Sequence, residues 1–239
     1  MSSLLEVRQV SKRFGGLAAV SDVSFTLNRG DVLAVIGPNG AGKTTLFNCM
    51  TGFLRPDSGT VWFDGQRIDR WPPHRTASYG LVRTFQSIRM FPGLTVYESL
   101  LASVPTSNRH SQGQRSVVDD AIAIIKRLQL ESVADRRCDD LPLLAQRTVE
   151  VGRALMARPV ALLLDEPTAG ATIGEREILG SLIADLQASG VSLVLIEHNV
   201  PFVMSVSTHI VVMHFGKVVA TGPPQTVAND PVVREIYLG

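Results

Sequence analysis

A segment at residues 37–44 has the residue types and the spacing of a phosphate-binding loop. Its sequence, Gly-Pro-Asn-Gly-Ala-Gly-Lys-Thr, fits the pattern G-x-x-x-x-G-K-[ST]. In such a loop the glycines let backbone N–H groups point at a nucleotide phosphate, the lysine reaches the β and γ phosphates, and the threonine hydroxyl binds Mg²⁺. We therefore expect Lys43 and Thr44 to bind ATP and Mg²⁺, and we do not favour the alternative of a glycine-rich turn with a chance lysine.

Two adjacent acids, Asp165 and Glu166, follow the apolar run at 161–164. Carboxylates at the end of a buried strand lie in the crevice where α/β proteins bind ligands. Asp165 would hold Mg²⁺ through water, and Glu166 would polarise the water that attacks the γ-phosphate. Taken alone, such a pair is more often a strand end with solvated charges. The phosphate loop earlier in the chain favours the catalytic interpretation.

Parallel strands are needed to bring these groups together. The apolar run at 32–36 feeds the phosphate loop and a helix that ends near Gly52, and the runs at 160–164 and 191–196 are also typical of strands buried on both faces. A helical segment separates the last two, so we expect them to lie parallel in one core sheet.

The rest of the chain predicts an antiparallel region and a helical insertion. Residues 4–27 alternate as strands do, Asp64-Gly65 marks a hairpin, and a strand at 81–85 makes the sheet mixed. Residues 87–157 are helical in pattern, beginning with a capping box of Thr95 and Glu98, although 103–116 is polar enough to indicate a surface loop. We predict an α/β fold in one domain.

Composition sets limits on partners and location. The chain has 239 residues, of which 45% are hydrophobic and 19% charged, with a net charge of +1, which gives no electrostatic reason to expect nucleic acid. Two distant cysteines suggest neither a zinc site nor a disulfide framework. No segment is apolar enough for a membrane span, and the first residues lack the pattern of a secretory signal.

Three further features resemble the nucleotide-binding domain of ABC transporters. They are Glu-Pro-Thr at 166–168, a glutamine at the end of the 81–85 strand, and Ile-Glu-His at 196–198. The resemblance implies the ABC ATPase fold, with a RecA-like P-loop NTPase core and antiparallel region at 1–86 and 158–239 and a helical subdomain at 87–157. It also implies that Gln86 touches Mg²⁺ and the attacking water and that His198 contacts the γ-phosphate. The expected ATP-binding residues are Phe14, stacked on adenine, with Gly37, Pro38, Asn39, Gly40, Ala41, Gly42, Lys43, Thr44 and Thr45. The alternative for Phe14 is an aromatic that packs on the sheet.

Three flanking segments resemble one group within this family. Residues 10–17, 83–86 and 229–239 are similar to the ATP-binding subunits of branched-chain amino-acid importers and of their urea and amide relatives. The resemblance implies an ATPase that powers solute uptake and is peripheral on the cytoplasmic face of the cell membrane. Its partners would be a second ABC ATPase subunit, permease subunits that dock near residues 86–91, and indirectly a solute-binding protein.

One segment departs from this family pattern. Where the family usually has Leu-Ser-Gly-Gly-Gln, this chain has Leu141, Pro142, Leu143, Leu144 and Ala145. In the family this signature contacts the γ-phosphate bound by the opposite subunit of a head-to-tail dimer. Proline offers neither hydroxyl nor N–H, and leucine side chains obstruct a close backbone approach. Thr172 also replaces the usual Asp or Asn.

We infer a heterodimer with one competent and one impaired ATP site. The alternatives are that the family tolerates these substitutions, or that this copy is decaying. Two other functions stay open: a regulatory nucleotide-binding half with little hydrolysis, and a soluble ABC ATPase of translation or DNA repair. The intact Glu166 and His198 oppose the first. The lack of a second such domain or a long coiled-coil insert opposes the second.

Overall fold

The computed structural model describes residues 3–85 and 90–238, and for 106–116 and 238 it describes the backbone alone. Within these ranges six strands form the central sheet, in the order β10-β9-β3-β8-β7-β6. Neighbours from β9 to β6 run parallel and β10 is antiparallel to β9, so the sheet is mixed as predicted. The strands are β3 (Val32–Ile36), β6 (Leu81–Arg83), β7 (Ala161–Asp165), β8 (Ser192–Ile196), β9 (His209–His214) and β10 (Lys217–Gly222).

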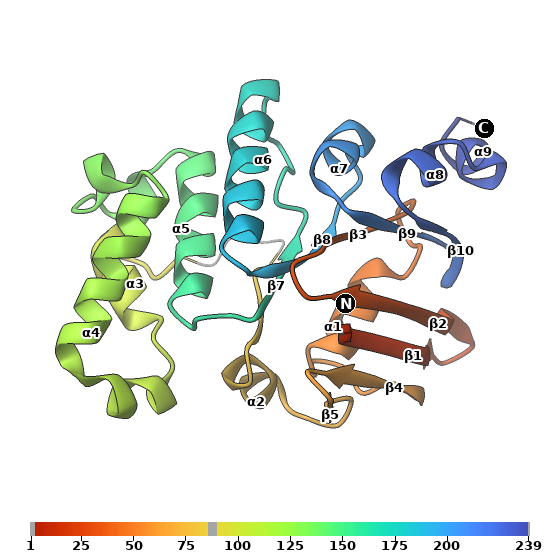
Figure 1. Ribbon diagram of the computed structural model, residues 1–239, viewed down its shortest axis with the longest axis horizontal. Helices are drawn as coiled ribbons and strands as arrows, with labels where there is room; N and C mark the ends of the chain where they lie inside the picture. Colours follow the sequence, from red (N-terminus) through yellow and green to blue (C-terminus); the bar gives the residue numbers. More distant parts are fainter. Residues whose placement is uncertain (1–2, 86–89, 239) are drawn as a thin grey trace.

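A second, antiparallel sheet lies beside the first (Figure 1). Four strands of the described chain form it, in the order β2-β1-β4-β5. The predicted hairpin at Asp64-Gly65 joins the last two, and Asp64 has the positive φ of 47° that such a turn needs. Its strands are β1 (Ser3–Phe14), β2 (Leu17–Asn28), β4 (Ser58–Phe63) and β5 (Gln66–Arg67).

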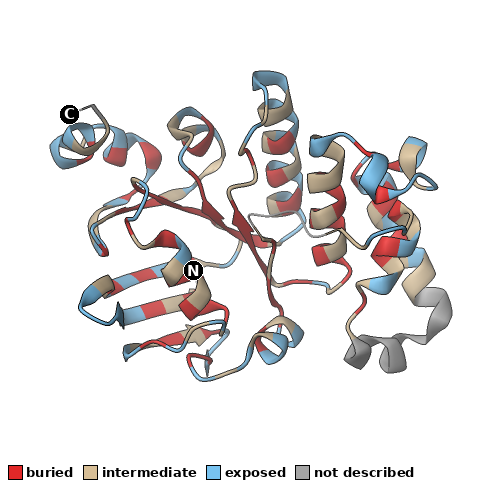
Figure 2. Ribbon diagram, turned by 180° about the vertical axis from the view of Figure 1, so that it is seen from behind, coloured by how far each residue is buried: buried red, intermediate tan, exposed pale blue. Residues whose placement is uncertain are grey.

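The two faces of the central sheet bury different layers. Along β3, Val32, Ala34 and Ile36 pack with the helices that follow, whereas Leu33 and Val35 pack with the antiparallel sheet and helix α1 (Lys43–Met50). Successive side chains of this apolar strand point to opposite faces of the sheet, so they pack in two different hydrophobic cores. Figure 2 shows this sheet as an almost unbroken band of buried residues.

Helices α3 (Val96–Ala102), α4 (Thr106–Arg127) and α5 (Leu143–Leu155) stand together beyond β6 (Figure 1). The predicted capping box is present, since the Thr95 hydroxyl accepts from the Glu98 amide at 3.2 Å. The interpretation of 103–116 as a loop is wrong, because α4 begins at Thr106. The apolar second half of this helix packs on the core at Ala121 and Ile125, and the helix extends from there into its polar first half.

The remaining helices flank the central sheet. Helix α6 (Ile173–Ala188) and helix α7 (Val200–Val206) precede β8 and β9, and α2 (Pro73–Ser78) precedes β6. Helices α8 (Pro224–Ala228) and α9 (Pro231–Leu238) lie at the β10 end, far from α3 and α4 (Figure 1). Short 3₁₀ turns occupy Glu131–Val133 and Cys138–Asp140. Among the residues that the structure describes, no helix combines the length and apolarity of a membrane span.

Candidate functional site

The phosphate loop connects β3 to α1, as its sequence predicts. Gly37 and Gly42 have φ of 154° and 96°, conformations that side chains disfavour. A Cβ atom on Gly37 would lie 2.2 Å from the Met213 carbonyl oxygen, and one on Gly42 would lie 2.1 Å from the Ala19 carbonyl oxygen. The loop is therefore pressed between β9 and β2, and these two positions admit only glycine.

Lys43 is the first residue of α1 and is 7% exposed. Its Nζ donates to the carbonyl oxygens of Gly37 at 2.7 Å and Pro38 at 3.0 Å. Burial lowers the pKa of Lys43, and the nearby carboxylates of Glu166 and Asp165 oppose that shift. The ammonium group is thus held where anionic phosphates would be compensated.

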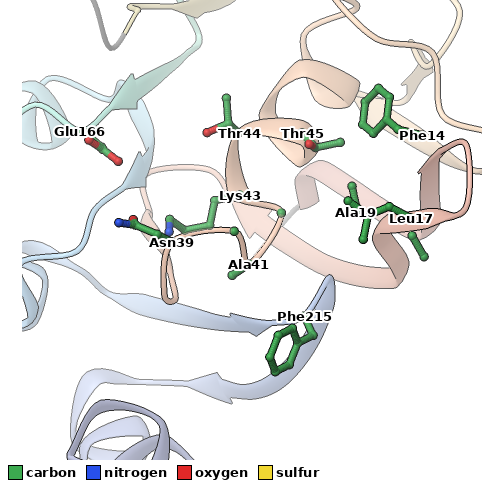
Figure 3. A pocket seen from close by; sticks show the side chains of 13 residues that line it. Phe14, Leu17, Ala19, Asn39, Ala41, Lys43, Thr44, Thr45, Glu166 and Phe215 are labelled. Atoms are coloured by element: carbon green, nitrogen blue, oxygen red, sulfur yellow. The ribbon is translucent and has the colours of Figure 1, made fainter.

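A cavity of about 500 Å³ opens beside the loop (Figure 3). This size suits a small-molecule ligand. Phe14 is 48% exposed on its rim, and the exposed Phe215 lies across the loop from it. Sequence reasoning missed Phe215, which lies in the β9–β10 turn and carries no pattern of its own. The predicted residues that line this cavity are Phe14, Asn39, Gly40, Ala41, Gly42, Lys43, Thr44, Thr45 and Glu166.

Asp165 ends β7 and is almost fully buried. Its Oδ2 accepts from the guanidinium of Arg83 at 2.5 Å, and the same guanidinium donates to Asn48 Oδ1 at 2.5 Å. Phe47 and Phe85 flank Arg83, each ring centroid 5.5 Å from its Cζ. Sequence reasoning missed Arg83, because only the pairing of β6 with β7 brings it to the acid.

Glu166 turns away from the strand with a positive φ of 49°, an unusual conformation for this residue type. Its amide still donates to the Ile196 carbonyl at 2.9 Å, which ties it to β8. Glu166 lines both the large cavity and a second one of about 360 Å³, which Gly37, Pro38, Asn39 and His198 also line. Glu166 and His198 therefore face one space at the end of the phosphate loop.

Glu197 positions the loop that carries His198. It is fully buried, with its Oε1 accepting from the Thr168 amide at 2.8 Å and its Oε2 from the His198 amide at 3.1 Å. One carboxylate thus joins the segment after the acid pair to the histidine. The sequence does not predict this role for Glu197, because a single acid after an apolar run is more typical of a solvated charge.

The segment that differs from the family signature lies on another surface. Residues 141–145 are not among the described residues that line the two cavities. Leu141 is buried, Pro142 is the N-cap of α5, and Leu143 is 47% exposed; Leu144 and Ala145 are half-buried. Two residues farther along α5, Arg147 donates to the carbonyls of Glu166, Pro167 and Ala169. The signature helix is therefore fastened to the loop that carries Glu166.

The chemistry of the donor set fits Mg²⁺. The described residues contain no cluster of three or more His, Cys, Asp or Glu that could hold a metal alone. Mg²⁺ usually takes one or two protein oxygens together with substrate phosphates and water, and Thr44 and Asp165 are such oxygens. Gln86, also predicted to contact the metal, lies outside the described residues.

Comparisons with known proteins agree with this geometry. A family model described as "ABC transporter" matches residues 20–169, and one described as "Branched-chain amino acid ATP-binding cassette transporter" matches 217–239. The high-affinity branched-chain amino acid transport ATP-binding protein BraF of Pseudomonas aeruginosa is 39% identical, covering 99% of this chain and 98% of that protein. LivG of Escherichia coli, which bears the same description, is 37% identical, with 99% and 98% covered.

Solved structures show the same fold. A nucleotide-free ATP-binding cassette from an ABC transporter has a TM-score of 0.90 and 33% identity, and an ADP conformation of such a cassette has a TM-score of 0.88 and 34% identity. All of this chain and all of each solved chain are covered. The chain therefore belongs to the ABC transporter family as an ATP-binding subunit, an ATPase homologous to those of branched-chain amino-acid importers.

Proposed function

We propose that this chain powers uptake of branched-chain or related amino acids by hydrolysing MgATP at the site around Lys43. Phe14 stacks on adenine, and Lys43 with the amides of residues 37–45 holds the phosphates. Glu166 polarises the attacking water, and His198 contacts the γ-phosphate. The observation that supports these roles best is that Lys43, Glu166 and His198 meet around adjoining cavities at one end of the phosphate loop.

Mg²⁺ would be held by Thr44, Asp165 and Gln86, and when bound it neutralises charge on the phosphates. Arg83 already engages Oδ2 of Asp165. Asp165 therefore acts on the metal through water, because its carboxylate is shared with a fixed guanidinium. Arg83 in turn orients this buried carboxylate.

The assembly that we propose is an unequal head-to-tail heterodimer. This chain's own half-site contains Lys43, Asp165, Glu166 and His198, whereas the surface it would offer to its partner contains Pro142 and exposed Leu143. The competent site would pair this phosphate loop with the intact signature of a second ABC ATPase. The opposite site would be impaired, and a regulatory role with little hydrolysis is the second candidate that the same departure favours.

The membrane partners are permease subunits, supplied indirectly by a solute-binding protein, and the chain is peripheral on the cytoplasmic face. We place the permease contact between the core lobe (1–86 and 158–239) and the helical subdomain (87–157). A cavity of about 420 Å³ lies there, lined by Phe85 and Phe91 among others. Phe91 is half-buried, and the Cζ of Arg153 lies 4.1 Å from its ring centroid.

The proposal is tested by an alanine substitution in each half of the assembled transporter. Lys43→Ala in this chain should abolish ATP-dependent uptake of radiolabelled leucine and most ATP hydrolysis in proteoliposomes. The equivalent lysine change in the partner ATPase should remove much less, because that site faces the Pro142 segment. Equal losses from the two changes would refute the asymmetry, and full hydrolysis after Lys43→Ala would refute the catalytic role of this chain.

A further inference from the structure

A tyrosine from the far end of the chain forms part of the wall of the cavity that Glu166 and His198 share. Tyr237 lies on α9, and it lines this cavity of about 360 Å³ together with Gly37, Pro38 and Asn39. Burial raises the pKa of Tyr237 to about 12, and the Gly37 backbone opposes that shift, as an N–H near the phenol oxygen does. The phenol is therefore protonated at any physiological pH and carries one hydrogen to donate.

The hydroxyl of Tyr237 is buried, and among the described residues it has no partner that meets full hydrogen-bond geometry. Leaving a buried hydroxyl unpaired is unfavourable, so such groups in proteins usually serve an interaction. Here the group that the hydroxyl faces is the phosphate loop itself. A role in packing alone would need no oxygen, because phenylalanine would fill the same volume.

The helix that carries Tyr237 is fixed by contacts elsewhere. The Asp230 carboxylate accepts from the Val232 amide at 2.8 Å and caps the first turn of α9. The Arg234 guanidinium donates to the Ala228 carbonyl at 3.0 Å and to Asn229 Oδ1 at 2.8 Å, which ties α9 to the end of α8. Val233 buries the inner face of the helix. Tyr237 is thus presented to the loop by a rigid support and need not hold the helix in place.

Lys43 and the Tyr237 hydroxyl approach the same end of the phosphate loop. The Lys43 Nζ donates to the carbonyls of Gly37 and Pro38, the same end of the loop that Tyr237 approaches. In the proposed function the Lys43 ammonium turns to the nucleotide phosphates. The Gly37 and Pro38 carbonyls then lose the hydrogen bonds that Lys43 donates to them. The Tyr237 hydroxyl lies at this end of the loop, on the side of His198, where its oxygen can accept from the Gly37 N–H and its hydrogen can be donated.

We propose that Tyr237 is a positioning residue for hydrolysis: its hydroxyl supports the Gly37–Asn39 end of the phosphate loop and makes α9 part of the ATPase site. This inference rests on the proposed function, because it concerns the same nucleotide. It assigns a role to the carboxyl-terminal segment of the chain. The hydroxyl faces the side of the loop near Glu166 and His198, so it acts on turnover more than on binding of the diphosphate.

The test is Tyr237→Phe in the full chain assembled with its partner subunits, with MgATP and MgADP as the probes. The turnover number for MgATP should fall roughly two- to tenfold, the effect of one lost hydrogen bond, while the Kd for MgADP stays within about twofold. Tyr79→Phe is the matched control, since Tyr79 is the C-cap of α2, is 40% exposed and packs its ring on Trp71 away from the site. It should leave both values unchanged.

Three results would overturn the inference. The first is a turnover number for Tyr237→Phe equal to that for Tyr79→Phe. The second is a lowered melting temperature with normal turnover, which would show a structural role only. The third is an equal loss in turnover and in MgADP affinity. Lys43→Ala, measured in parallel, separates this inference from its premise: if that variant still hydrolyses MgATP normally, the proposed function fails, whatever the tyrosine variant does.

Discussion

Arg147 is the residue whose replacement tests the architecture of the site most directly. From the second turn of α5 its guanidinium donates to the carbonyls of Glu166, Pro167 and Ala169, with the first of these at 3.0 Å. These carbonyls follow the strand that delivers Asp165. One side chain therefore contacts three carbonyls of the loop in which Glu166 adopts its positive φ. We expect Arg147→Ala to lower both stability and hydrolysis.

The magnitude follows from the three contacts. A hydrogen bond from a charged group contributes about 1.5–3 kcal/mol when buried, but these carbonyls are half-buried, so about 1 kcal/mol each is a fair value. The total loss is about 3 kcal/mol, which for a chain of this length corresponds to a fall in melting temperature of roughly 6–12 °C. Arg147→Lys should recover only about a third of that loss, because an ammonium lacks the planar fork that reaches several acceptors.

Thermal unfolding and MgATP hydrolysis of the full chain measure the two effects. Arg176→Ala is the matched control, because Arg176 on α6 makes a single long contact, from its Nε to the Thr172 carbonyl at 3.4 Å. Its melting temperature should stay within about 2 °C of the parent value, as expected for a surface substitution. If Arg147→Lys matched the parent chain in stability and turnover, the reasoning from multiple carbonyl contacts would be refuted.

Two further predictions concern the phosphate loop and a buried acid. Gly42→Ala should weaken MgATP binding at least roughly tenfold in a fluorescence titration, because its Cβ would lie 2.1 Å from the Ala19 carbonyl oxygen. Gly40→Ala has the same kind of backbone strain, with φ +80°, but no described atom within 4 Å, so it should weaken binding less than Gly42→Ala does; equal losses would contradict the steric argument. Burial raises the pKa of Glu150, so its ionised form disfavours the folded state increasingly as pH rises. Glu150→Gln should therefore raise the melting temperature more at about pH 8 than at about pH 5, and the reverse order would show that the charge itself is stabilising.

The sequence predicts the framework of the site because its signals are local. A buried strand of five residues, a glycine-rich loop and a helix start identify the phosphate loop without any tertiary information. The capping box at Thr95 and the hairpin at Asp64 are local in the same sense, and both are confirmed. The polar stretch at 103–116 misled the prediction, since a helix anchored at its apolar half can extend through residues that carry no periodic pattern.

The residues that support the site could not be predicted, because each acts across strands or from the far end of the chain. Arg83 meets Asp165 only through the pairing of β6 with β7, and Glu197 reaches the Thr168 amide only when β8 lies beside β7. Tyr237 requires the fold of α8 and α9 against β10. Their residue types are common on any surface, and only their burial distinguishes them.

The segment from Leu141 to Ala145 shows why the departure from the family signature need not disturb this chain's own fold. Pro142 has ψ of 154° at the N-cap of α5, a position where a missing N–H breaks no helical hydrogen bond. Leu143 begins the helix with its side chain 47% exposed. The one internal contact that Pro142 forgoes is a side-chain cap, which a serine could give the first turn of α5. In the head-to-tail dimer that we propose, the larger consequence of these substitutions falls on the nucleotide bound by the partner, because a serine hydroxyl and glycine amides would face that ligand.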